Sequence, residues 1–130
     1  MTPKRISEII NMIPSECNPR LGGSCSLYFR GKVDSYNDID IIVKKGTIDK
    51  VNLPFPKIEL VHKVRLNRTI KYCIDSRKVD IIESMYNVDR VEKSTMGFYL
   101  EYEKDVIESK KQINAFLNNC YVKRANGCTY

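Results

Sequence analysis

Apolar residues near the start of the chain recur at the spacing of a helix. They fall at positions i, i+3, i+4 and i+7, which predicts an amphipathic helix over residues 3–13. Thr2 is a suitable N-cap, Pro3 fits the first turn, and Pro14 ends the helix. The apolar face consists of Ile6, Ile9, Ile10 and Ile13.

A glycine-rich turn follows a short apolar segment. Residues 20–21 predict a short strand, and Gly22-Gly23-Ser24 comes directly after it. Residues 25–30 lack strand alternation and end before Gly31, which predicts a short helix with a glycine at its C-terminal end. Ser24 then lies at a helix N-terminus, where unpaired N–H groups and the helix dipole favour an anion.

The middle of the chain contains short runs rich in β-branched residues, which predict strands. Asp75-Ser76-Arg77 separates two of these runs and suits a tight hairpin. From residue 87 the apolar positions approximate a helical stripe, so we expect helix up to about residue 119 and fraying at residues 127–130. The predicted strands are residues 38–43, 58–64, 69–74 and 78–83.

Length and element order together predict one α+β domain. A chain of 130 residues has room for one core. We expect a mixed β-sheet flanked by helices. Its core should lie at about residues 4–84, with a helical C-terminal part at about residues 87–119.

The chain has no apolar run of membrane-spanning length and no signal-peptide core near its start, so we expect no membrane partner. Its five cysteines include no C-x-x-C pair. Such a set without a secretion signal predicts reduced thiols and a cytoplasmic protein. His62 is the only histidine, which leaves little material for a histidine zinc site or a Ser-His-Asp triad.

The net charge of +6 is concentrated in one segment. Residues 44–80 carry ten basic and four acidic side chains, and 10 − 4 = 6 is the whole excess. This block suits a polyanion such as a triphosphate or RNA. A solvated lysine-rich face explains the same charge equally well.

Two aspartates flank one isoleucine in the run Asp38-Ile39-Asp40. The period of two in a strand places both carboxylates on one face, about 6–7 Å apart at their Cα atoms. Carboxylates in this arrangement can bind a divalent metal between them. The Gly22-Gly23-Ser24 turn can bring backbone N–H groups up to a phosphate.

Three motifs follow one another in the chain. They are Leu21-Gly22-Gly23-Ser24, Asp38-Ile39-Asp40-Ile41 and Val79-Asp80-Ile81. This order resembles the DNA polymerase β-like nucleotidyltransferase superfamily, in which a hydrophobic residue and a Gly-Gly or Gly-Ser turn precede a D-h-[DE]-h strand and a later h-[DE]-h strand. The resemblance covers roughly residues 4–84. The compact size is similar to the minimal members, including toxin-type and tRNA-nucleotidyltransferase-like proteins.

The resemblance implies a Mg²⁺-dependent enzyme that transfers NMP from an NTP to a hydroxyl of an acceptor and releases pyrophosphate. Asp38, Asp40 and Asp80 would bind two Mg²⁺ ions and form the catalytic set, with Asp80 also accepting the proton of the attacking hydroxyl. Gly22, Gly23 and Ser24 would bind the β- and γ-phosphates.

Other functions remain open at the level of sequence. The same fold could serve as a noncatalytic module that binds nucleotide or RNA, or as a structural partner in an assembly. We expect RNA as the acceptor, with a tRNA end first, because residues 44–80 connect the strand of Asp38 and Asp40 to that of Asp80. The basic residues of the binding module would be Lys44, Lys45, Lys57, Lys63, Arg65, Arg68, Lys71, Arg77 and Lys78.

Overall fold

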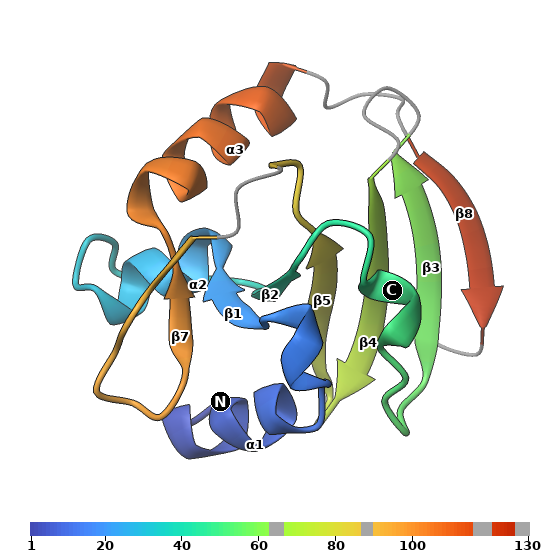
Figure 1. Cartoon of the computed structure of the whole chain (residues 1–130), viewed down its shortest axis with the longest axis horizontal. Helices are drawn as coiled ribbons and strands as arrows, with labels where there is room; N and C mark the ends of the chain where they lie inside the picture. The colour runs from blue at the N-terminus through green and yellow to red at the C-terminus, as the bar shows by residue number, and fades with distance from the viewer. Residues whose placement is uncertain (63–66, 87–89, 116–120, 127–130) are drawn as a thin grey trace.

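The computed structural model describes residues 1–62, 67–86, 90–115 and 121–126. The strands form one mixed sheet in the order β6-β7-β1-β2-β5-β4-β3-β8. In Figure 1, α1 lies at the bottom of the view and α3 at the top, with β1, β2 and β5 between them. The α+β class and the mixed sheet are therefore confirmed.

The elements have the following bounds. The helices are α1 (Pro3–Asn11), α2 (Gly23–Phe29) and α3 (Glu103–Ala115), and single 3-10 turns occur at Ser15–Cys17 and Ile48–Lys50. The strands are β1 (Arg20–Gly22), β2 (Ile39–Val43), β3 (Lys57–His62), β4 (Arg68–Ile74), β5 (Arg77–Glu83), β6 (Val91–Glu92), β7 (Tyr99–Glu101) and β8 (Tyr121–Asn126).

The first two helices match the sequence predictions. The Arg5 backbone N–H donates to Thr2 Oγ1 at the start of α1, and the isoleucine face of this helix is buried in the core. Helix α2 is followed by Gly31, whose φ of +77° is the left-handed conformation that glycine readily adopts after a helix. Capping and periodicity therefore placed both helices to within about two residues.

The central strands β1, β2 and β5 have one face in the hydrophobic core and an opposite face that carries the aspartates. Strand β1 is antiparallel to β2, and β2 is parallel to β5. Ile39, Ile41 and Ile81 are buried in the hydrophobic core. Because side chains alternate along a strand, Asp40 and Asp80 point to the opposite face.

The hairpin between β4 and β5 is confirmed, with a turn one residue shorter than predicted. Asp75 and Ser76 have φ of 52° and 61°, as in the two-residue turns that match strand twist. Ile74 pairs with Arg77, so Arg77 belongs to β5 and not to the turn. This register places Lys71 opposite Asp80.

The prediction of a helix from residue 87 is wrong over its first part. Helix α3 begins only at Glu103, and residues 99–101 form β7, which pairs in parallel with β1. Pairing with β1 and burial of Leu100 outweigh the local helical pattern, and Gly97, with φ of +90°, allows the turn before β7. Residues 116–119 and the expected frayed end at 127–130 lie outside the described residues.

The cysteines differ in state. Cys17 and Cys25 are buried free thiols, whereas Cys73 is disulfide-bonded. The expectation of reduced thiols therefore fails at Cys73. In the described part of the chain, no helix is both long and apolar enough to cross a membrane.

Candidate functional site

The three predicted motifs meet in one row across the sheet. Gly22 of β1 pairs with Asp40 of β2, Asp40 pairs with Asp80 of β5, and Asp80 pairs with Lys71 of β4. Directly paired residues on neighbouring strands have Cα atoms about 5 Å apart. Gly22 and Asp80, which are 58 positions apart in the sequence, thus lie in the same row of the sheet.

Negative charge is concentrated at the centre of this row. Burial raises the pKa of Asp40 well above its usual range, and the neighbouring charges of Asp80 and Asp38 raise it further. Asp80 is 5% exposed, and burial raises its pKa as well. The Lys71 ammonium, with its Nζ 2.8 Å from Asp80 Oδ2, opposes the rise at Asp80. Among these acids, Asp80 therefore has a direct counter-charge.

Asp38 joins the row from the loop before β2. It lines a hollow of about 270 Å³ together with Ser24, Ser35, Tyr36, Asn37 and Asp40. Asp38 and Asp40 therefore line the same opening, although Asp38 lies one residue before the strand that was predicted to contain both. Ser24 of the glycine turn lies at the same opening.

The two glycines of the turn allow carboxylates to approach the backbone. A Cβ on Gly23 would lie 2.0 Å from Asp40 Oδ2, and the φ of Gly23 is +60°. A Cβ on Gly22 would lie 2.5 Å from Glu101 Oε1. Any larger residue at either position would displace a carboxylate of the site.

Glu101 is a fourth acid of the site, and the sequence did not predict it. It follows Leu100, the partner of Leu21, and so lies beside Gly22 at the end of the row. Its Oε1 accepts a hydrogen bond of 3.4 Å from the Gly23 backbone N–H. Glu101 is 6% exposed, and burial raises its pKa to about 7. The local sequence does not predict a site residue here, because residues 99–101 fit the helical stripe expected from residue 87.

A second cavity of about 240 Å³ adjoins the acids on the side of α3. Ser24 and Asp40 line it as well as the first hollow. Its other walls include the apolar side chains of Ile42, Ile82, Met85 and Val106. The cavity thus combines an apolar wall with a polar mouth.

Two polar groups of this cavity are placed to bind a ligand. Asn67 is 9% exposed, its Nδ2 donates to the Glu83 carbonyl, and its Oδ1 has no hydrogen-bond partner. A buried acceptor without a partner costs free energy that a ligand donor can recover. Lys110 of α3 donates from Nζ to Ser24 Oγ at 3.2 Å, which brings a positive charge to the glycine turn.

The acids fit Mg²⁺ shared with a substrate. In the described ranges, no group of three His, Cys, Asp or Glu side chains is arranged to hold a metal ion alone. Mg²⁺ is usually bound by one or two carboxylates together with substrate phosphates and water. Asp38 and Asp40 supply two carboxylates at one hollow, and Asp80 Oδ1 is buried without a partner.

The basic residues of the middle segment have several different partners. Arg68 pairs with Asp49, Lys71 pairs with Asp80, and Lys57 lies 4.0 Å from Glu59. Lys63 and Arg65 lie outside the described residues. Three residues of the predicted basic surface are therefore engaged in local ion pairs.

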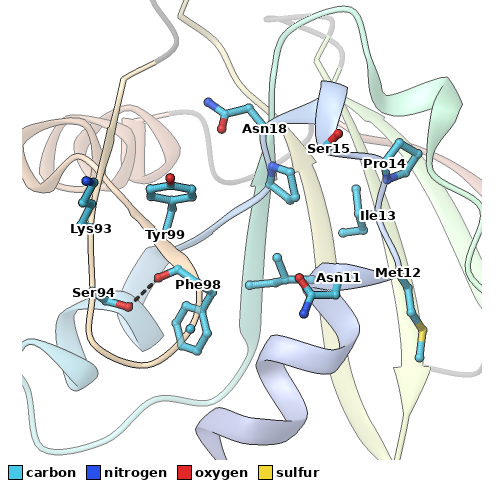
Figure 2. Close-up of a pocket in the computed structure, with 13 residues that line it drawn as sticks. Asn11, Met12, Ile13, Pro14, Ser15, Asn18, Lys93, Ser94, Phe98 and Tyr99 are labelled. Atoms are coloured by element: carbon cyan, nitrogen blue, oxygen red, sulfur yellow. Dashed lines mark hydrogen bonds between the residues drawn. The ribbon is translucent and has the colours of Figure 1, made fainter.

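A larger cavity of about 680 Å³ lies elsewhere, between the end of α1 and the loop before β7 (Figure 2). Met12, Phe98 and Tyr99 line it, and Ser94 donates a hydrogen bond to the Phe98 carbonyl. Lys93 is the one charged side chain among the described residues that line this cavity. No carboxylate, histidine or cysteine, the usual metal ligands, is among these lining residues.

The chain matches no model of a protein family, no curated protein and no solved structure. The functional conclusion therefore rests on the chemistry of its own residues.

Proposed function

We propose that the protein is a Mg²⁺-dependent nucleotidyltransferase with a nucleotidyltransferase-like fold, which transfers NMP from an NTP to a hydroxyl of an acceptor. The observation that carries this proposal is the direct pairing of Asp40 with Asp80 in the row that begins at the glycine turn. Like charges placed opposite each other destabilise a sheet. A site that binds cations would offset this repulsion.

The proposed cofactor is two Mg²⁺ ions held by Asp38, Asp40 and Asp80. When bound, such ions neutralise the charge of the phosphates and orient the attacking and leaving oxygens. Asp38 and Asp40 would hold the triphosphate at the hollow through this shared coordination. Their mutual repulsion, which raises the Asp40 pKa, would be relieved at the same time.

The glycine turn would form the subsite for the β- and γ-phosphates. Ser24 Oγ and Lys110 Nζ are neighbouring donors at its mouth. The Gly23 N–H is engaged by Glu101 through a bond at the long end of the usual range, so a phosphate oxygen would compete for it. Gly22 and Gly23 would let the phosphates approach the backbone closely.

The cavity beside α3 would receive the nucleoside of the donor. Ile42, Ile82 and Val106 offer an apolar wall to the base. Asn67 Oδ1 would accept a hydrogen bond from an exocyclic amino group of the base.

In the transfer step one bond to phosphorus forms, another breaks, and one proton is transferred. The acceptor hydroxyl oxygen would attack the α-phosphorus, the bond from this phosphorus to the bridging oxygen would break, and pyrophosphate would leave. Asp80 would accept the hydroxyl proton, and a raised pKa makes its carboxylate a stronger base. Lys71 would hold Asp80 Oδ2 and leave Oδ1 for this task.

A noncatalytic nucleotide- or RNA-binding module of the same fold is the second candidate. Two contacts favour it, because in each a group assigned to metal or phosphate already has a partner within the protein. Lys71 neutralises Asp80, and Glu101 engages the Gly23 amide. The two candidates differ in whether Asp40 and Mg²⁺ are required.

Calorimetric titration with an NTP whose α,β-bridging oxygen is replaced by methylene tests the proposal. We expect binding that requires Mg²⁺ and is lost in Asp40→Asn, while Asp49→Asn binds like the wild type. Asp49 is a suitable control because it is an exposed aspartate that pairs with Arg68 and lines none of the site cavities. Binding that ignores both Mg²⁺ and Asp40 would favour the noncatalytic module.

A further inference from the structure

Three aromatic rings form a partly exposed cluster beside the acidic site. The ring centroids of Tyr28 and Tyr36 are 5.0 Å apart, and those of Tyr28 and Phe29 are 5.2 Å apart. Tyr28 is 40% exposed. Phe29 and Tyr36 pack partly against the core, so they hold the cluster in place.

The cluster borders a hollow of about 450 Å³ that shares lining residues with the acidic site. Met1, Pro3, Asp34 and Arg77 complete the lining of this aromatic hollow. Ser35 and Tyr36 line both the aromatic hollow and the hollow of Asp38 and Asp40. A ligand that rests on the rings can therefore extend directly to the carboxylates.

The helix α2 sets the distance between rings and site. Ser24 and Tyr28 are four residues apart and so lie on the same side of the helix. Four residues correspond to about 6 Å of rise along the helix. A group that reacts beside Ser24 can thus be attached to a planar group stacked at Tyr28.

Two charged groups face the hollow with opposite effects. Arg77 is exposed at the start of β5 and lines the hollow. Its positive charge opposes the rise in the Tyr36 pKa that burial causes, so it lies near that ring. Asp34 is an exposed carboxylate that repels phosphate and can accept from a hydroxyl or amino group.

We infer that the aromatic hollow binds the terminal base of a single-stranded RNA acceptor, with Arg77 on a backbone phosphate and the terminal ribose at Asp38 and Asp40. The role of that ribose hydroxyl rests on the proposed function, whereas the binding itself does not. Aromatic side chains stack on any base, and a nearby arginine adds a phosphate contact. Rings and an arginine at one hollow suit a nucleotide, which carries both a planar base and a phosphate, better than a protein segment.

Binding of a fluorescein-labelled single-stranded RNA decamer, followed by anisotropy without NTP, tests the inference. Tyr28→Ala should weaken binding on the order of 5- to 100-fold, the range for loss of one stacked base. Tyr28→Phe should bind like the wild type because the ring is kept. Arg77→Gln should reduce the salt slope of log K by about 0.7, the value for one phosphate contact on a single strand.

Tyr99→Ala is the matched control. Tyr99 is 45% exposed and lines the separate cavity of Figure 2. Its removal should leave the RNA affinity unchanged. A duplex of the same sequence should bind more weakly than the single strand, since its bases are already stacked. Equal losses in Tyr28→Ala and Tyr99→Ala, or no RNA binding by the wild type, would overturn the inference.

Asp40→Asn separates this inference from the proposed function. The variant should lose nucleotide transfer and should lose less RNA affinity than Tyr28→Ala, because Asp40 lies outside the aromatic hollow that holds the stacked base. If the wild type binds RNA in a Tyr28-dependent way and transfers no nucleotide, the aromatic hollow is an RNA-binding site and the proposed enzymatic function is wrong. If transfer occurs and Tyr28→Ala leaves both RNA affinity and the KM for RNA unchanged, the hollow is not the acceptor site.

Discussion

Asp40 and Asp80 lie directly opposite each other on the parallel strands β2 and β5. Gly23 lies against the carboxylate of the first, and the ammonium of Lys71 lies against that of the second. Residues from four elements, α2, β2, β4 and β5, therefore meet at this pair. Its geometry determines how the site should respond to substitution.

Replacing Asp40 with asparagine should stabilise the protein and abolish its activity. The variant loses a buried charge that Asp80 and Asp38 repel, so the unfolding free energy at pH 8 should rise by about 1 kcal/mol. Under the proposed function, nucleotide transfer should fall on the order of a thousandfold or more, because the proposed metal site loses a ligand. Urea denaturation and a transfer assay measure the two effects. Unchanged transfer would remove Asp40 from the metal site.

Lys71→Met should leave the buried charge of Asp80 without its counter-charge. The variant keeps the aliphatic stem and removes the ammonium, so we expect a loss of about 2–3 kcal/mol at pH 8 and a smaller loss at pH 5, where Asp80 binds a proton more readily. Adding Asp80→Asn should restore most of the stability. Denaturation of the single and double variants at both pH values measures this coupling. Additive losses would show that the ion pair contributes nothing.

Gly23→Ala should cost more than Gly31→Ala. Both glycines have positive φ, so both variants carry backbone strain of about 1–2 kcal/mol. A Cβ at Gly31 meets nothing within 4 Å, whereas a Cβ at Gly23 would overlap the Asp40 carboxylate. The difference in unfolding free energy therefore reports the contact alone, and we expect at least about 1 kcal/mol. Mg²⁺-dependent nucleotide binding should be lost only in Gly23→Ala, and equal behaviour of both variants would contradict the close approach.

Glu101 should make stability fall as pH rises from about 4.5 to about 7. Its pKa is raised by burial from 4.5 to about 7 in the folded state, so the folded state binds the proton more tightly than the unfolded state. The stabilisation is complete below the unfolded pKa and is lost as pH rises through the folded value. The total for this residue is at most about 3 kcal/mol.

Glu101→Gln should remove most of that slope and raise the stability at pH 8. Glutamine keeps an acceptor for the Gly23 N–H and carries no charge. Urea denaturation at four pH values between 5 and 8 measures the slope. Asp40 and Asp80 leave a residual slope in the variant, since their pKa values are also raised. An identical slope in the wild type and the variant would show that Glu101 is ionised throughout.

The sequence predicted those parts of the site whose pattern is local. The isoleucine period predicted α1, Gly31 marked the end of α2, and the alternation around Ile39 placed Asp38 and Asp40 at one opening. These features depend on residues close together in the chain, where period and turn chemistry decide.

The parts that were missed depend on pairing between distant segments. Glu101 reaches the site only because Leu100 pairs with Leu21, about eighty residues earlier. Lys71 faces Asp80 because the turn at Asp75 contains two residues and not three, and a shift of one residue would turn a side chain to the other face. Local pattern does not report strand partners across such distances.

Transfer of label from an NTP to RNA tests the central proposal most directly. The protein is incubated with Mg²⁺, total RNA and each NTP in turn, labelled at either the α- or the γ-phosphate. We expect the α-label to enter RNA, the γ-label to leave as pyrophosphate, and neither to move with Asp40→Asn or without Mg²⁺. Failure of the α-label to enter RNA from any of the NTPs, or entry of the γ-label instead, would contradict nucleotidyl transfer to RNA by this site.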